Sequence, residues 1–287
     1  MSQEALDAAE MTDASLERCR ALLAWGFARQ DEEVGLAALR RARDLAVACD
    51  ASDELARSHL ALALSLTQLG RRNEREQALR DGLGPAAAHG LGGSYVPAMR
   101  YLLVELLLET GRWQEADKLL DESMERGVSG VPAMFIHACR ALLAARRGDE
   151  ASLAAAADRV EALSEDMPQQ PVPRAIVQRA RAEAALWAGE PATAVTLAAQ
   201  ADVPGLDVLG HRSALALQAR AVADLSDLAR RDGRAPPPMP QDIEGEAGDL
   251  SPQHHPRIRA LSATISGELS RHRGYREAAP WRQAVTT

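Results

Sequence analysis

The stretch that decides the fold reads Glu109-Thr110-Gly111-Arg112-Trp113-Gln114-Glu115-Ala116. Its glycine follows a leucine-rich helical run. A glycine followed by a charged or polar residue recurs along the chain at Gly70, Gly111, Gly148, Gly189, Gly233 and Gly274. The intervals between these glycines are 41, 37, 41, 44 and 41 residues. A fixed period of about 20–50 residues indicates a repeat protein, in which no single unit buries its hydrophobic face alone.

Between these turns the apolar residues recur three and four positions apart, which predicts helices and no strand up to about residue 233. The turn glycine supplies a left-handed residue after each first helix, and Ser52 or Asp53 is a candidate N-cap for the helix that ends at Gly70. In the first pair, Gln30-Asp31 stands where the glycine is expected. The predicted helix pairs are 14–29 with 33–49, 53–69 with 73–90, 97–110 with 112–127, 132–147 with 149–164, and 174–188 with 191–202, followed by one long helix over about 206–232.

The period is interrupted after residue 233. Residues 234–256 are rich in Pro, Gly and acidic residues and have no apolar period, so we expect a flexible loop that buries too little surface to become ordered. A helix is predicted again over 257–272, with Leu261, Ile265 and Leu269 on one face. The expected organisation is therefore a helical array over 1–233, a loop over 234–256, and one or more C-terminal helices over 257–287 that pack on the array.

Composition limits the classes of function. The net charge is −8, and Lys118 is the only lysine, which argues against a nucleic-acid surface because phosphate binding needs clustered cations. Cys19, Cys49 and Cys139 lie in apolar helical runs, which suits reduced and buried thiols. No apolar run reaches the ~18 residues of a membrane span, and the N-terminus does not resemble a signal peptide. We expect a cytoplasmic protein that contacts neither membranes nor nucleic acid directly.

The turn at residues 109–116 resembles the tetratricopeptide (TPR) turn, with an aromatic residue two positions and an alanine five positions after the glycine. The period of about forty is longer than the usual 34 of that repeat. Taken in order, four stretches resemble the helical-repeat region of large LuxR-family, MalT-like transcriptional regulators. The stretches are residues 69–72, 109–116, 181–191, and 268–271 followed by 281–285. The resemblance implies a right-handed α-solenoid of six to seven TPR-like repeats that serves as a sensor or oligomerisation region.

Such regulators also carry an ATPase module and a DNA-binding helix-turn-helix, and this sequence has neither pattern. It contains no Gly-x-x-x-x-Gly-Lys-Ser/Thr loop, because the only lysine lies in the middle of a predicted helix. Since the sequence reads only to Thr287, we do not expect it to contain the DNA-binding helices. The chain therefore corresponds to the middle of such a regulator, either as a fragment or as a stand-alone relative. ATP hydrolysis and direct DNA binding are not expected.

Catalytic and metal-binding patterns are weak. The adjacent pair His254-His255 has no further ligands at an ordered spacing, so a solvated loop explains it better than a metal site. The cysteines have no histidine partner that the sequence suggests, and no Gly-x-Ser-x-Gly motif occurs. We expect no catalytic residue, no cofactor and no metal.

The position eleven before the turn glycine is polar in four successive repeats. If the first helices stack, these residues form a ladder of donors and acceptors for a peptide or a small effector. The alternative is that they bridge neighbouring helices. The four residues are His59, Arg100, His137 and Gln178.

The TPR resemblance also implies a concave wall formed by first helices, at ten, six and two or three positions before the glycine. Phe135, thirteen positions before Gly148, would face the same groove, although Tyr101 and Phe135 could equally belong to the core. A mixture of aromatic and charged side chains suits a recognition groove. The candidate groove residues are Tyr101, Glu105, Phe135, Arg179, Glu183 and Trp187.

We therefore expect a non-catalytic sensor or protein-interaction domain of a LuxR-type regulator, which binds a protein, a peptide or a small effector and could form a homodimer. The alternative is a free-standing TPR-like adaptor without a transcriptional role. A third reading, a helical enzyme, would need a deep pocket with convergent titratable groups.

Overall fold

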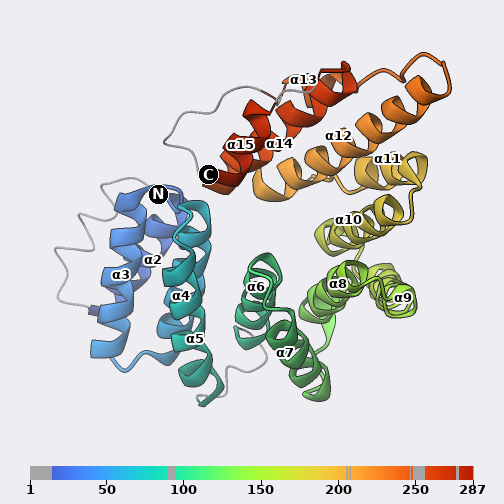
Figure 1. Cartoon of the computed structure of the whole chain (residues 1–287). Coiled ribbons are helices and arrows are strands. Elements are labelled where there is room, and N and C mark those ends of the chain that lie inside the picture. The colour runs from blue at the N-terminus through green and yellow to red at the C-terminus, as the bar shows by residue number, and fades with distance from the viewer. Residues whose placement is uncertain are drawn as a thin grey trace. The chain divides into compact units, whose positions relative to one another are not determined.

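The structure is a computed structural model that describes residues 15–88, 95–204, 206, 208–245, 247, 256–275 and 278–286. These residues form a succession of helices and contain no strand, which confirms the all-α class (Figure 1). The chain forms two compact units, residues 1–133 and 134–287. The division lies inside the segment 1–233 that we expected to be one array.

The first unit contains α2 (Ser15–Ala28), α3 (Glu33–Ala48), α4 (Ser52–Gln68), α5 (Arg72–Ala88), α6 (Val96–Glu109) and α7 (Trp113–Glu125), and α8 (Gly130–Arg147) begins in it. The second unit continues with α9 (Glu150–Asp166), α10 (Pro171–Trp187), α11 (Pro191–Gln200), α12 (Val208–Arg231), α13 (Gln241–Gly245), α14 (Pro256–His272) and α15 (Ala279–Thr286). The bounds of the helices that the sequence predicts lie within three residues of these.

Contacts within each unit join helices that are one or two apart in the chain. In the first unit α2 packs on α3 and α4, α4 packs on α5 and α6, and α6 packs on α7. In the second unit α10 packs on α9, α11 and α12, and α12 packs on α11 and α14. Within each unit a first helix therefore contacts the next first helix, as α2, α4 and α6 do in the first unit and α10, α12 and α14 do in the second.

The repeated glycine ends each first helix in the conformation that the sequence predicts. All six turn glycines have positive φ, from 68° at Gly233 to 84° at Gly274. At Gly189 the amide of Glu190 donates to the carbonyl of Ala185 at 2.8 Å, and the amide of Gly189 donates to Leu186 at 3.2 Å. This pair of hydrogen bonds is the Schellman motif, which satisfies the last carbonyls of a helix and needs a left-handed residue. The period in the sequence is thus a period of helix ends.

The N-cap prediction at the start of α4 is wrong. Ser52 is already the first residue of the helix, and Ala51 is the N-cap, which has no side-chain oxygen to accept a hydrogen bond. Asp50 takes the left-handed conformation there, with φ 52°, and so ends α3 as the glycines end the first helices. The Asp50 turn connects one pair to the next, a position where the sequence did not indicate a left-handed residue.

The hydrophobic core of the first unit is centred on α2, α3 and α4. Leu22, Leu36 and Leu39 are fully buried in it, together with Cys19. A Cβ at Gly35 would lie 2.0 Å from the carbonyl oxygen of Arg29, so α3 starts in backbone contact with the end of α2. This close approach explains a tight first pair that lacks the turn glycine.

The expectation that residues 234–256 bury too little to pack is wrong for the described part of the segment. Ile243 on α13 is completely buried, and Met239 is 9% exposed. Both belong to a core cluster with Leu215 of α12 and Ile265 of α14. These two buried side chains anchor the described part of the segment in the core. Because two buried residues do not form a periodic pattern, the sequence did not predict their burial.

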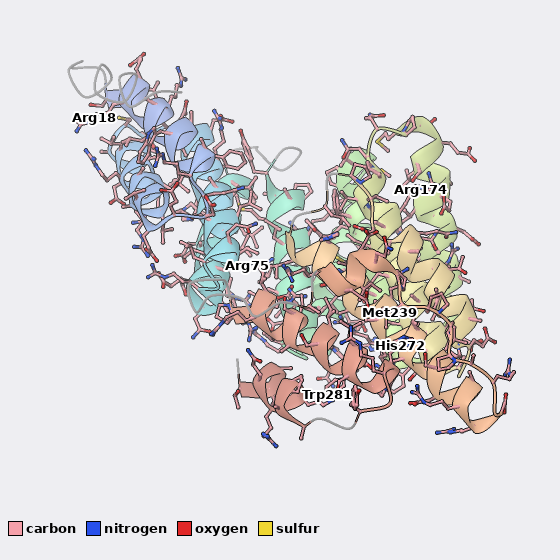
Figure 2. The ribbon with its side chains drawn as sticks, turned by 90° about the horizontal axis from the view of Figure 1, so that it is seen from above. Arg18, Arg75, Arg174, Met239, His272 and Trp281 are labelled. Carbon is pink, nitrogen blue, oxygen red and sulfur yellow. The ribbon has the colours of Figure 1, made fainter. Side chains whose placement is uncertain are left out.

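The last helix, α15, packs on α14 through a glycine. A Cβ at Gly267 would lie 2.7 Å from the indole ring of Trp281, so the ring packs on α14 only because Gly267 has no side chain. Trp281 remains 37% exposed, and Figure 2 labels it together with Met239 and His272 of the same unit. The sequence predicted C-terminal helices that pack on the array, and the contact between Gly267 and Trp281 is how α15 packs on α14.

Candidate functional site

In the first unit the polar ladder residues lie between helices. His59 on α4 is 7% exposed, and its Nδ1 is 3.1 Å from the carbonyl oxygen of Ala78 on α5. Burial lowers the pKa of His59. Arg100 on α6 is also 7% exposed, and its Nη1 donates to Ser123 Oγ on α7 at 3.4 Å. Both residues thus make the bridging contacts that the sequence allowed as an alternative, and a role in ligand binding stays a prediction.

In the second unit the ladder residues are half-buried. Burial, helped by Arg159 and Arg140, lowers the pKa of His137 on α8. Gln178 on α10 holds its Oε1 buried without a hydrogen-bond partner among the described residues. These two residues are less enclosed than His59 and Arg100, so the four ladder positions do not share one environment.

The groove candidates of the first unit are Tyr101 and Glu105 on α6, and both are half-buried. Glu105 accepts a hydrogen bond from Arg75 Nη2 at 2.9 Å, and Arg75 is 3% exposed on α5 (Figure 2). Arg75 also donates to the carbonyl of Leu102 at 3.0 Å. Glu105 therefore helps to neutralise a buried arginine, in addition to any role in a groove.

The groove candidates of the second unit lie on α8 and α10, which are the first helices of their pairs. Phe135 and Arg179 are half-buried. Glu183 on α10 accepts from Arg146 Nε of α8 at 3.4 Å. Trp187, one turn further along α10, is 72% exposed. An aromatic side chain of this size on the surface is the most informative feature of the set, because it contributes little to the core.

Arg220 and Arg146 lie beside Trp187 and Glu183, and no pattern in the sequence indicates them. The guanidinium of Arg220 on α12 lies over the Trp187 ring, 5.5 Å from its centroid, at a distance typical of a cation–π contact. Arg146 of α8 pairs with Glu183 of α10. We call Arg146, Glu183, Trp187 and Arg220 the Trp187 surface. Counting positions back from the turn glycines could not have grouped these residues, because they stand at different positions within their repeats.

A cavity of about 400 Å³ adjoins Trp187. It is formed where α8 turns into α9 and where α10 ends, and Arg147, Asp149 and Leu153 line it together with Trp187. Its lining contains both apolar and charged side chains, as in many recognition sites. The Trp187 surface thus combines an exposed aromatic ring, neighbouring charges and a hollow beside the ring.

A second cavity of about 690 Å³ lies where α12, α14 and α15 meet. Arg230, Arg271 and Trp281 line it. Arg230 donates to the last carbonyls of α14, at 2.8 Å from Arg271 O and 2.7 Å from His272 O, and Arg271 pairs with Asp224. The two arginines are therefore engaged in helix capping and ion pairing.

The described residues contain no group of three or more His, Cys, Asp or Glu that could hold a metal ion. His254-His255 lies outside the described residues. The three cysteines are free thiols; Cys19 and Cys139 are buried as expected, whereas Cys49 is only half-buried. Burial raises the pKa of Cys19 to about 11, so this thiol is protonated at neutral pH. Within the described part of the chain, no helix has both the length and the apolar character needed to span a bilayer.

Comparison with known proteins gives no relative: no family model matches the chain, and no curated protein is similar to it. The functional assignment therefore depends on the chemistry of the surfaces described above.

Proposed function

We propose that this chain is a TPR-like α-solenoid that binds a partner and has no catalytic role of its own. The Trp187 surface carries this proposal. An indole that is 72% exposed, with a guanidinium over one face and a cavity of about 400 Å³ beside it, has the properties of a binding hot spot. The stacking of first helices on one another supports the solenoid, because it repeats one contact along the chain.

The LuxR-type regulator remains the biological setting that we propose, on the resemblance of the four sequence stretches. In that setting a protein, a peptide or a small effector binds along the first helices in the cytoplasm and biases attached modules between two states. The net charge of −8 favours such a partner over a polyanion. A free-standing TPR-like adaptor is the alternative, and the genes beside this one distinguish the two settings.

The test uses the product of a neighbouring reading frame that encodes an ATPase or a helix-turn-helix. We expect this product to co-purify with the full chain, and we expect Trp187→Ala to weaken the complex by about tenfold or more, since exposed aromatic anchors dominate interface energies. Trp281→Ala is the matched control, because Trp281 is a partly exposed tryptophan that rests on Gly267 of α14 and does not belong to the Trp187 surface.

A complex of unchanged affinity in Trp187→Ala would contradict the assignment of this surface. The absence of any such neighbouring frame would favour the adaptor over the regulator.

A further inference from the structure

Four charged side chains are buried among the described residues, and three of them lie within ion-pair distance of an opposite charge. Glu54 accepts from Arg20 at 2.6 Å, Arg75 pairs with Glu105 at 2.9 Å, and Glu268 lies 3.1 Å from Arg271. Arg100 is the exception, because no carboxylate of the described residues lies within ion-pair distance of its guanidinium. A buried charge without a counter-charge is costly in a folded protein.

The hydrogen bonds of Arg100 are also incomplete. Its Nη1 makes one long contact of 3.4 Å with Ser123 Oγ, and its Nε is buried without a partner. Ser123 Oγ itself donates to Leu119 O, so it can accept from the arginine. Five N–H donors of a guanidinium therefore share one acceptor among the described side chains.

Arg100 lines a cavity of about 430 Å³ within the first unit. Arg126, which is exposed and follows the end of α7, lines the same cavity, and none of the described residues that line it is acidic. The remaining wall is mostly apolar and comes from Val96, Pro97 and Val128 among others. The neighbouring charge of Arg126 adds to burial in lowering the pKa of Arg100, while Glu122 opposes this effect. The cavity is thus positive in a protein whose net charge is −8.

Helix ends of both kinds line this cavity. Val96 and Pro97 at the start of α6 and Pro132 near the start of α8 lie at ends with partial positive charge, whereas Ala87 at the end of α5 and Gly127 after α7 lie at ends with partial negative charge. The prolines have no N–H to offer an anion. The positive charge of the cavity therefore comes from its two arginines.

We propose that this cavity binds a small organic anion. Its carboxylate or phosphate group would bind between Arg100 and Arg126, and its apolar part would rest on Val96, Pro97 and Val128. The volume of about 430 Å³ suits a metabolite-sized ligand. The ligand would supply the counter-charge that the described residues do not place within ion-pair distance of Arg100. This site shares no residue with the Trp187 surface, so each can fail independently of the other.

Isothermal titration and thermal unfolding of the full chain test this site with benzoate and phenyl phosphate, which distinguish the two anionic groups, and with benzyl alcohol as the neutral control. We expect at least one of the two anions to bind and raise the Tm, since a ligand that binds only the folded state stabilises it. Benzyl alcohol is expected to bind about tenfold more weakly or not at all.

Three variants locate the site. Arg100→Met and Arg126→Met are each expected to weaken anion binding by about tenfold or more, whereas Arg57→Met, at an exposed arginine of α4, leaves it unchanged. Arg100→Met is also expected to be as stable as the unliganded wild type or more so, because it removes an uncompensated buried charge. If Arg100→Met does not fold, Arg126→Met decides, since its side chain is exposed.

The absence of binding by both anions at up to roughly 10 mM would overturn the proposal. Binding that persists in Arg126→Met and in a folded Arg100→Met would overturn it as well. Non-specific stabilisation by anions would raise the Tm of all variants equally, and this result also counts against the site.

Discussion

At the scale of single residues, Glu268 is a buried carboxyl whose surroundings disfavour its charge. It is 3% exposed on α14, and it shares Arg271 with Asp224 and Asp227. Burial raises the pKa of Glu268 to about 7, Asp224 and Asp227 add to the effect, and Arg271 and Arg220 oppose it. One arginine thus serves three carboxylates, and the most deeply buried of them holds its proton longest.

This environment predicts a pH-dependent stability. A carboxyl whose pKa is higher in the folded than in the unfolded chain contributes stability fully below its unfolded pKa of 4.5, and this stability is lost as the pH rises through about 7. We expect Glu268→Gln to raise the free energy of unfolding by on the order of 1–3 kcal/mol at pH 8, and to change it little at pH 4. Urea unfolding of both proteins at the two pH values measures the difference.

Glu165→Gln is the matched control, since Glu165 is exposed on α9 and is expected to change nothing at either pH. An equal effect of Glu268→Gln at both pH values would show that packing, rather than ionisation, is responsible.

The hydrogen-bond partners of the ladder residues could not be predicted from the sequence. The pattern correctly identified His59 and Arg100 as regularly placed polar residues. Their partners, Ala78 and Ser123, lie 19 and 23 residues further along the chain, on the following helix. The pairing of polar atoms depends on how one helix is rotated relative to the next. The periodicity within a single helix gives no information about that rotation.

At the scale of helices, the turn glycines were the most reliable signal. A Cβ at Gly189 would meet no atom within 4 Å, so only its φ of 76° requires glycine. We expect Gly189→Ala to lower the free energy of unfolding by about 1–2 kcal/mol, because alanine is strained in the left-handed region. Gly189→Asn should cost less, since asparagine tolerates that region better. Thermal or urea unfolding of the three proteins tests this order.

If alanine and asparagine proved equally harmless, the left-handed residue would not be what ends α10. Steric crowding is already excluded as the cause of any loss at this position, since the space around it is open.

Helix bounds were predictable wherever a helix has a long apolar stripe, and less so elsewhere. The helices from α2 to α12, and α14, follow the period closely. α13 is five residues long, and Ile243 alone among them is buried, so a pattern had nothing to detect. α15 buries no residue fully, and its contact depends on Trp281 meeting Gly267, which is fourteen residues earlier in the chain. Such pairings are tertiary and leave no local trace.

At the scale of the whole chain, the segment after residue 233 belongs to the core of the second unit. Met239, Ile243, Ile265 and Leu269 pack with residues of α12. We expect a chain that ends at Asp232 to expose the apolar face of α12, to melt at a lower temperature than the full chain, and to self-associate. A chain that ends at Tyr275 keeps this cluster and loses only α15, so it should stay close to the full chain in both respects.

Light scattering after size-exclusion chromatography, together with thermal unfolding, compares the three lengths. A stable monomer ending at Asp232 would show that the core cluster contributes little. A dimer of the full chain that persists in the Tyr275 form would place self-association elsewhere than on α15.

The candidate site was predictable only in part at this scale. The TPR resemblance selected Glu183 and Trp187, which contribute to one surface, but Tyr101 and Glu105 belong to the other unit. It missed Arg220, because the cation–π contact joins different repeat positions on α10 and α12. The eleven-residue spacing placed Arg100 in a ladder, whereas Arg100 is distinguished by having no carboxylate of the described residues within ion-pair distance, which only the packed structure reveals.

The neighbour-to-neighbour contacts described above have a consequence for how the chain acquires its structure. Partners such as α2 with α4, or α12 with α14, are separated by a single intervening helix or by one short segment. Chains dominated by such local contacts fold quickly, because little loop entropy is lost before native contacts form. Each helix pair can therefore pack while the next one is still leaving the ribosome, so that folding proceeds from the N-terminus at the pace of synthesis.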